Sequence, residues 1–121
     1  MQEELKSKIL QINRRLYESG VDVTQLVSSL ISNYEHGMEA SKKCEIAWVL
    51  DEVESFGKNS EKMHDMLDEA LKKGKIGRNL WFEAKGVISE MERNFPKNIA
   101  KNMARTCGCR FVLPPWLKDW D

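Results

Sequence analysis

The chain has 121 residues, of which 41% are hydrophobic and 31% charged, and its 19 basic side chains balance its 19 acidic ones. This length suits one domain with a sizeable core, and the hydrophobic fraction is too high for a disordered chain. The sequence lacks an apolar run of ~18 residues and its N-terminus lacks the apolar segment of a signal peptide, so we expect a cytoplasmic protein that does not engage a membrane.

Apolar residues recur three and four positions apart through most of the chain, which is the spacing of amphipathic helices. Glycines follow these segments at intervals, and glycine is the residue that most often ends a helix. The pattern predicts helices over residues 3–19, 22–37, 38 or 41–57, 59 or 60–74 and 77–94, with Gly20, Gly37, Gly57 and Gly74 ending the first four.

A break is expected at Phe95-Pro96, because proline suits the first turn of a new helix. A sixth helix then occupies residues 95–108 and ends at Gly108, and residues 109–121 form an extended aromatic tail with two prolines. We therefore predict a single all-α domain over residues 1–121, a compact bundle of five to six helices in which residues 1–94 are a five-helix scaffold. The short glycine-containing turns favour antiparallel neighbours.

Charge is distributed unevenly along the chain. Residues 39–71 carry four Lys/Arg against nine Asp/Glu, whereas residues 72–113 carry ten against three. Such polarity steers a charged partner, or else the two regions face each other across the bundle. The sequence leaves both interpretations open.

The basic sixth helix holds the most pointed pattern. Its cations, together with the arginine just before it, recur every four residues and so stack along one helical face, with asparagines beside them. Such a face suits an acidic protein surface, or the phosphates and base edges of a nucleic acid. A solvated outer face is the plain alternative. The candidate partner-binding residues here are Arg93, Lys97, Asn98, Lys101, Asn102, Arg105 and Arg110.

Four aromatic side chains complete the candidate surface. Trp81 and Phe82 are adjacent, so both cannot point into one helical seam. Trp116 and Trp120 lie four apart in the tail and would share one side of a helical turn. Tryptophan is a preferred anchor of protein interfaces, but exposed tryptophans are a liability, which favours docking of the tail on its own bundle. Docking on another molecule, including a second copy of the chain, stays open.

The three cysteines argue against a secreted disulfide framework, because their number is odd and Cys107 and Cys109 are one residue apart. Zinc ligands are usually separated by two to four residues, so this pair does not form a zinc motif by itself. We predict free thiols and no metal or other cofactor. A tertiary zinc site that adds Cys44, His36 or His64 is the alternative.

The sequence contains no glycine-rich phosphate loop and no HExxH, GxSxG or CxxC motif, so we do not expect an enzyme. It favours a small intracellular adaptor or inhibitor that acts through protein–protein contacts. The alternative is a nucleic-acid-binding module that uses the basic face of the sixth helix.

One segment bears on that alternative. Residues 16–31, LYESGVDVTQLVSSLI, resemble the collar-domain helices of clamp-loader subunits. The resemblance covers this segment alone, without the ATPase modules of that family. It implies a replication-associated accessory role and assigns no site residues.

Overall fold

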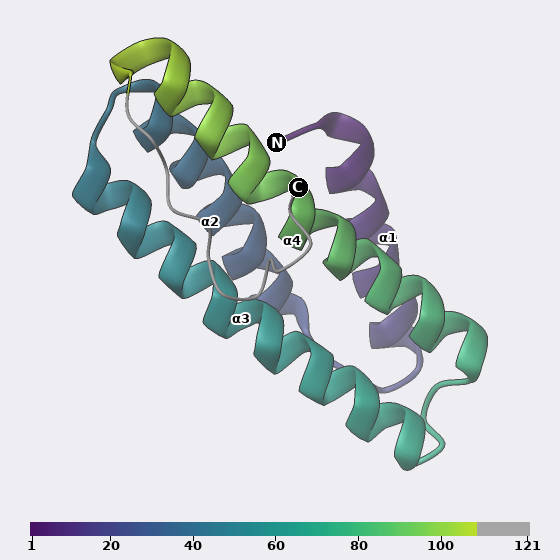
Figure 1. Cartoon of the computed structure of the whole chain (residues 1–121). Coiled ribbons are helices and arrows are strands. Elements are labelled where there is room, and N and C mark those ends of the chain that lie inside the picture. The colour runs from purple at the N-terminus through teal and green to yellow at the C-terminus, as the bar shows by residue number, and fades with distance from the viewer. Residues whose placement is uncertain (109–121) are drawn as a thin grey trace.

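The computed structural model describes residues 1–108, which form four helices and no strand (Figure 1). Helix α1 spans Glu3–Glu18, α2 spans Thr24–Lys42, α3 spans Ile46–Lys72 and α4 spans Arg78–Cys107. The all-α class is therefore confirmed. The expected number of helices is wrong, because two pairs of expected helices are each continuous. The expected aromatic tail lies outside the described residues.

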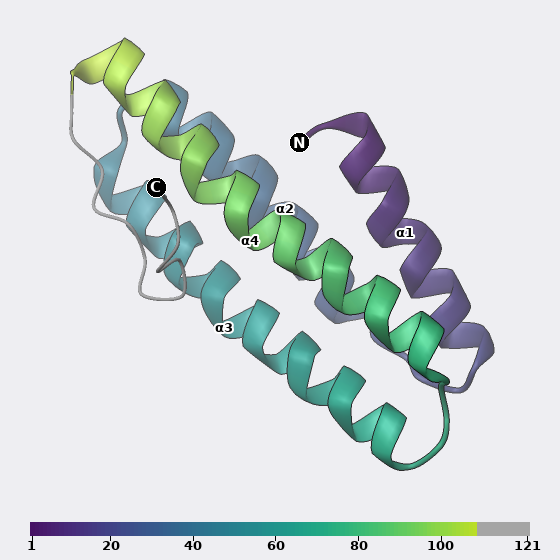
Figure 2. The ribbon, with the colours of Figure 1, turned by 45° about the vertical axis from the view of Figure 1, so that its right-hand side comes forward.

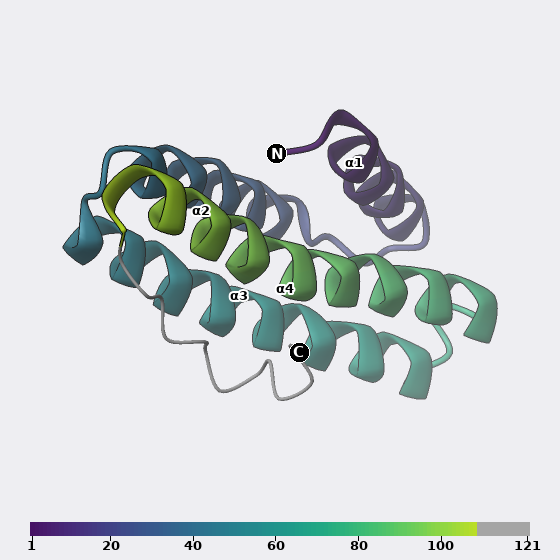
Figure 3. The ribbon, with the colours of Figure 1, turned by 45° about the horizontal axis from the view of Figure 1, so that its top comes forward.

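Successive helices run in opposite directions, and α2, α3 and α4 pack side by side along their length (Figures 1 and 2). Helices α2 and α4 are neighbours of each other and of both remaining helices, whereas the backbones of α1 and α3 are not adjacent. The pair α2 and α4 therefore forms the centre of the bundle, with α1 on one side and α3 on the other (Figure 3). Within residues 1–108, no helix has the length and apolar character needed to cross a bilayer.

All four helices contribute to one hydrophobic core. At its centre lie three aromatic rings, Tyr34 from α2, Phe56 from α3 and Phe95 from α4, each at most 1% exposed. The Phe95 ring centroid lies 4.9 Å from that of Tyr34 and 4.7 Å from that of Phe56. Burying one such side chain contributes about 1.5–3 kcal/mol, so this cluster is a strong link between the three longest helices.

The predicted helix end at Gly37 is wrong, because α2 continues to Lys42. Gly37 is buried inside α2, and a Cβ atom at this position would lie 2.5 Å from the ring of Phe95. This glycine therefore serves close helix packing rather than helix termination. The predicted ends at Gly20, Gly74 and Gly108 are confirmed, and all three glycines have positive φ.

The predicted end at Gly57 is also wrong, because α3 runs through it as one helix of 27 residues. The buried face continues without a change of register from Val53 and Phe56 to Ser60 and Met63. A glycine in a helix interior costs about 1 kcal/mol relative to alanine. Burial of the side chains on both sides outweighs that cost.

The predicted helix break at Phe95-Pro96 is also wrong. Pro96 lies inside α4, a single helix of 30 residues, so the expected sixth helix is the C-terminal part of α4. Proline in a helix interior removes a backbone donor and costs about 3 kcal/mol. Pro96 itself and its neighbours Phe95, Ile99 and Met103 are buried, and this packing keeps the helix continuous.

The Gly37 contact leads to a test of the core. We expect Gly37→Ala to lower the free energy of unfolding by about 1–2 kcal/mol, because the added methyl group must displace the Phe95 ring. Gly86→Ala is the matched control, since Gly86 is exposed in α4 and its added Cβ would meet nothing within 4 Å. The control should gain about 0.5–1 kcal/mol from helix propensity. Urea unfolding of both variants measures the difference, and equal stabilisation of the two would contradict the packing role.

Candidate binding surface on α4

The predicted row of cations is a continuous feature of α4. Arg93, Lys97, Lys101 and Arg105 are all exposed, and the helix carries them past Pro96 without a break. In an α-helix, residues four apart are separated by about 6 Å along the axis and turned by about 40°. The row therefore extends over about 18 Å and winds gradually around the outer face of the helix. We call these four residues the cation row.

The cation row differs from most other basic side chains of residues 1–108 in having no acidic partner within that range. Within residues 1–108, none of its four members lies within ion-pair distance of a carboxylate, and Arg105 instead donates to the amide oxygen Oδ1 of Asn102 at 3.0 Å. Among the described residues, no carboxylate therefore neutralises the positive charge that the row presents to solvent. The basic side chains that do have such partners are Lys6, Lys8, Arg14, Arg15, Lys43, Lys58, Lys73 and Lys85.

Unpaired cations also occur elsewhere in the described part of the chain. They are Lys42, Lys62, Lys72, Lys75 and Arg78, all exposed. Three of these flank the turn between α3 and α4, at the far end of α4 from Arg105. They do not form a regular line on one helix, so the cation row is the more ordered surface.

The two asparagines predicted beside the row are engaged inside the protein. Asn98 donates from Nδ2 to the Tyr34 hydroxyl at 3.0 Å, and the buried Asn102 donates from Nδ2 to the Ser41 hydroxyl at 2.9 Å. Both contacts join α4 to α2. These amides therefore fix the helix beneath the row, and their donors are not directed toward a ligand.

Trp81 and Phe82 lie near the other end of α4. The indole Nε1 of Trp81 donates to Asp68 Oδ1 at 2.9 Å, and Lys85 Nζ lies 5.2 Å from the centroid of the indole ring. Phe82 is 74% exposed, the highest value among the large hydrophobic residues of the described chain. It lies eleven residues before Arg93, which is about three helical turns, so both face the same side about 16 Å apart.

The structure thus gathers the four cations along α4 and places Phe82 on the side of the helix that carries Arg93. Trp81 is engaged in a contact of its own. Arg110, Trp116 and Trp120 lie outside the described residues. The prediction that the tail contributes to the surface therefore remains a prediction.

The residues considered for a metal site are only partly brought together. Cys44 Sγ lies 3.3 Å from the Thr106 hydroxyl, next to Cys107. His64 is on α3, with Nε2 3.3 Å from Glu92, and His36 on α2 lies 3.8 Å from Glu52. Among residues 1–108, no three His, Cys, Asp or Glu side chains cluster closely enough to hold a metal ion. Cys109 lies outside this range.

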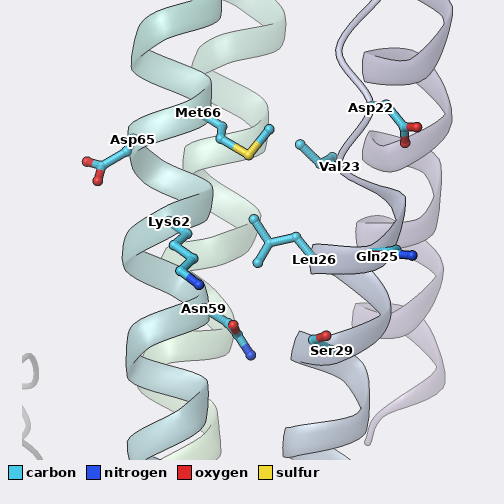
Figure 4. A pocket seen from close by; sticks show the side chains of 9 residues that line it. All are labelled: Asp22, Val23, Gln25, Leu26, Ser29, Asn59, Lys62, Asp65 and Met66. Atoms are coloured by element: carbon cyan, nitrogen blue, oxygen red, sulfur yellow. The ribbon is translucent and has the colours of Figure 1, made fainter.

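A shallow groove separates the N-terminal part of α2 from α3 (Figure 4). Val23, Leu26 and Met66 point into the gap, whereas the carboxylates of Asp22 and Asp65 point away from it. Asp22 accepts from the Thr24 backbone N–H at 3.1 Å, and this hydrogen bond lowers the pKa of the Asp22 carboxyl. The Asp22 carboxylate therefore stabilises the backbone at the start of α2. The polar groups of the groove do not converge on one point.

A polar network between α2 and α3 was not predicted from the sequence. Asn33 donates to Glu52 at 2.8 Å and accepts from Asn59 at 2.9 Å, and Trp48 Nε1 donates to the second Glu52 oxygen at 3.1 Å. The one signal in the sequence is the polar Asn33 directly beside Tyr34 on the buried face of α2. This network pins the register of the two helices.

No protein-family model, curated protein or solved structure matches the chain. The functional argument therefore depends on the residues and contacts described above.

The internal position of Asn102 can be tested directly. Asn102→Ala removes the hydrogen bond to Ser41 inside the core, so we expect the free energy of unfolding to fall by about 1–2 kcal/mol. Asn79→Ala is the control, because Asn79 is exposed near the start of α4 and its replacement should change stability by less than about 0.5 kcal/mol. Denaturant unfolding followed by circular dichroism compares the two. A stable Asn102→Ala variant would return this residue to the candidate binding surface.

The contact of Asp68 with Lys85 and Trp81 predicts a pH effect. The hydrogen bonds from Lys85 and then Trp81 lower the pKa of the Asp68 carboxyl. Since the folded pKa lies below the unfolded one, this contact stabilises the fold above the ordinary aspartate range. The stabilisation disappears as the pH falls through the folded pKa. The NMR signal of the Trp81 indole N–H should therefore shift with a midpoint below the ordinary aspartate pKa. Asp68→Asn should abolish the shift and Asp65→Asn should retain it.

Proposed function

We propose that this protein is a small intracellular, non-enzymatic binding protein that uses the cation row of α4 to dock on an acidic surface of a partner protein. The observation that carries the proposal is the absence of carboxylate partners for Arg93, Lys97, Lys101 and Arg105 within residues 1–108, although eight other basic side chains have them. An exposed, regular and unneutralised row of charge is suited to an external partner of opposite charge.

The spacing of the row supports an extended acidic partner surface. Its cations recur about every 6 Å, and acidic side chains three or four apart on a partner helix have a similar repeat. Each exposed ion pair contributes only about 0.2–1 kcal/mol, so the row acts through several contacts together. Its main effect is on the rate and orientation of encounter.

An apolar contact on the same face would complete the interface. Phe82 is available for this role, because its ring is 74% exposed and lies on the side of α4 that carries Arg93. Aromatic side chains are enriched in the centre of protein interfaces, whereas isolated charges at the rim contribute little. We therefore assign Phe82 as the apolar contact and the cation row as the steering surface.

A nucleic acid is the second candidate partner, because phosphates also bind rows of exposed cations. Base readout from this face is disfavoured by the internal hydrogen bonds of Asn98 and Asn102. The nucleic-acid alternative is therefore limited to backbone contacts with strong salt dependence.

The test combines charge reversal with a matched control. Lys97→Glu, Lys101→Glu and Arg105→Glu are introduced together, and the control carries Lys62→Glu, Lys72→Glu and Lys75→Glu. The two triple variants change the net charge by the same amount. Both replace exposed cations that have no acidic partner in residues 1–108. Each also includes one cation in the last turn of a helix, Arg105 in α4 and Lys72 in α3. Tagged wild-type and variant proteins are used to capture partners from nuclease-treated extract of the source cells, with quantification by mass spectrometry.

We expect an acidic protein to be enriched by the wild type and the control, and at least tenfold less by the row variant. Equal enrichment by all three proteins would show that the row is not the docking surface. Binding of labelled single-stranded and duplex oligonucleotides is measured in parallel over a range of salt concentrations. Salt-dependent oligonucleotide binding that only the row variant loses would favour the nucleic-acid alternative.

A further inference from the structure

Two of the three cysteines meet at one end of the bundle, although they are far apart in the sequence. Cys44 lies in the turn between α2 and α3, and Cys107 is the last residue of α4. Figures 1 and 3 show this end of α4 beside that turn. The Thr106 hydroxyl lies 3.3 Å from Cys44 Sγ and 3.9 Å from Cys107 Sγ, and both cysteines are half-buried.

The two thiols share one neighbour, the Thr106 hydroxyl. The pKa of Cys44 is raised, first by a hydrogen bond with the Cys107 thiol. The two thiols are therefore close enough to interact. The sequence pattern associates Cys44 with Cys107 only as part of an alternative zinc site, and it is the tertiary fold that places residue 44 near residue 107.

Rigid neighbours hold this arrangement in place. Thr106 Oγ1 lies 3.2 Å from the Ser41 carbonyl oxygen and 2.7 Å from that of Asn102, and Asn102 in turn donates to the buried Ser41 hydroxyl at 2.9 Å. Cys44 has φ of +57°, a backbone conformation that is uncommon for residues other than glycine. The end of α2, the turn and the end of α4 therefore form one connected unit around the thiols.

We propose that Cys44 and Cys107 are an oxidation site and form a reversible disulfide when the protein encounters hydrogen peroxide. Because both sulfurs lie beside the Thr106 hydroxyl, the S–S bond of about 2.05 Å would join two side chains that are already neighbours.

The reaction balances with peroxide as the oxidant. One thiol loses its proton, its thiolate attacks a peroxide oxygen, and the O–O bond breaks to leave a sulfenic acid and water. The second thiolate attacks the sulfenic sulfur, forms the S–S bond and expels hydroxide, which becomes water with the proton of the second thiol. Overall, two thiols give two electrons and two protons to one peroxide and yield one disulfide and two waters.

The disulfide would tie the end of α4 covalently to the turn between α2 and α3. Arg105, the last member of the cation row, lies two residues before Cys107, so oxidation fixes that end of the row against the bundle. The proposal is independent of what the row binds. It concerns only the chemistry of the two thiols.

The experiment uses the full chain, reduced and freed of metal by a chelator that is then removed. Cys109→Ser eliminates the third thiol, and two further proteins add Cys44→Ser or Cys107→Ser to it. Each protein is treated with a small excess of hydrogen peroxide. Intact mass, non-reducing peptide mapping and thermal unfolding are then measured, with circular dichroism to confirm that each variant is folded.

The Cys109→Ser protein should lose about 2 Da, the mass of two hydrogens, and regain it with dithiothreitol. Its map should contain a peptide that links Cys44 to Cys107, and its Tm should rise on oxidation because a long loop is closed. Both double variants should lack these changes. A monomer that gains oxygen atoms without losing two hydrogens, or a bridge only between two molecules, would overturn the proposal. In the wild type, a bridge only between Cys107 and Cys109 would also overturn it.

Discussion

The approach of the Phe95 ring to the backbone of Gly37 is the contact on which the bundle depends. No Cβ fits between them, so α2 and α4 come closer here than ordinary side chains permit. The ring then reaches both Tyr34 and Phe56. Three helices are thereby joined at one point. Burial of Phe95, next to Pro96, also fixes the path of α4 past the proline.

The continuity of α4 has a direct effect on its outer surface. A break at Pro96 would separate Arg93 from the other three cations and give the two parts unrelated directions. In the continuous helix the four residues follow one regular line. Packing on the inner face of α4 therefore determines the geometry of charge on its outer face, and Asn98 and Asn102 reinforce this by bonding to α2.

Local patterns in the sequence predicted the helical class, the ends at Gly20 and Gly74 and the four-residue spacing of the row. They failed at Gly37, Gly57 and Pro96, because these residues are helix-ending signals only when tertiary contacts do not compensate their cost. Which cations find carboxylates is also a tertiary property: Arg15 pairs with Glu83 and Lys8 with Glu90 across helices. The same holds for the meeting of Cys44 and Cys107, which no spacing in the sequence reveals.

The peripheral position of α1 has a consequence for the way the molecule opens. Its buried residues are Leu5, Ile9, Ile12 and Leu16, and its backbone has α2 and α4 as neighbours but not α3. Helices α2, α3 and α4 each touch one another, and they alone carry the three-ring cluster. Segments with fewer tertiary contacts unfold locally at lower free energy than the rest of a protein. We therefore expect the amide protons of α1 to exchange faster than those of the other three helices, and α2, α3 and α4 to stay packed when α1 detaches.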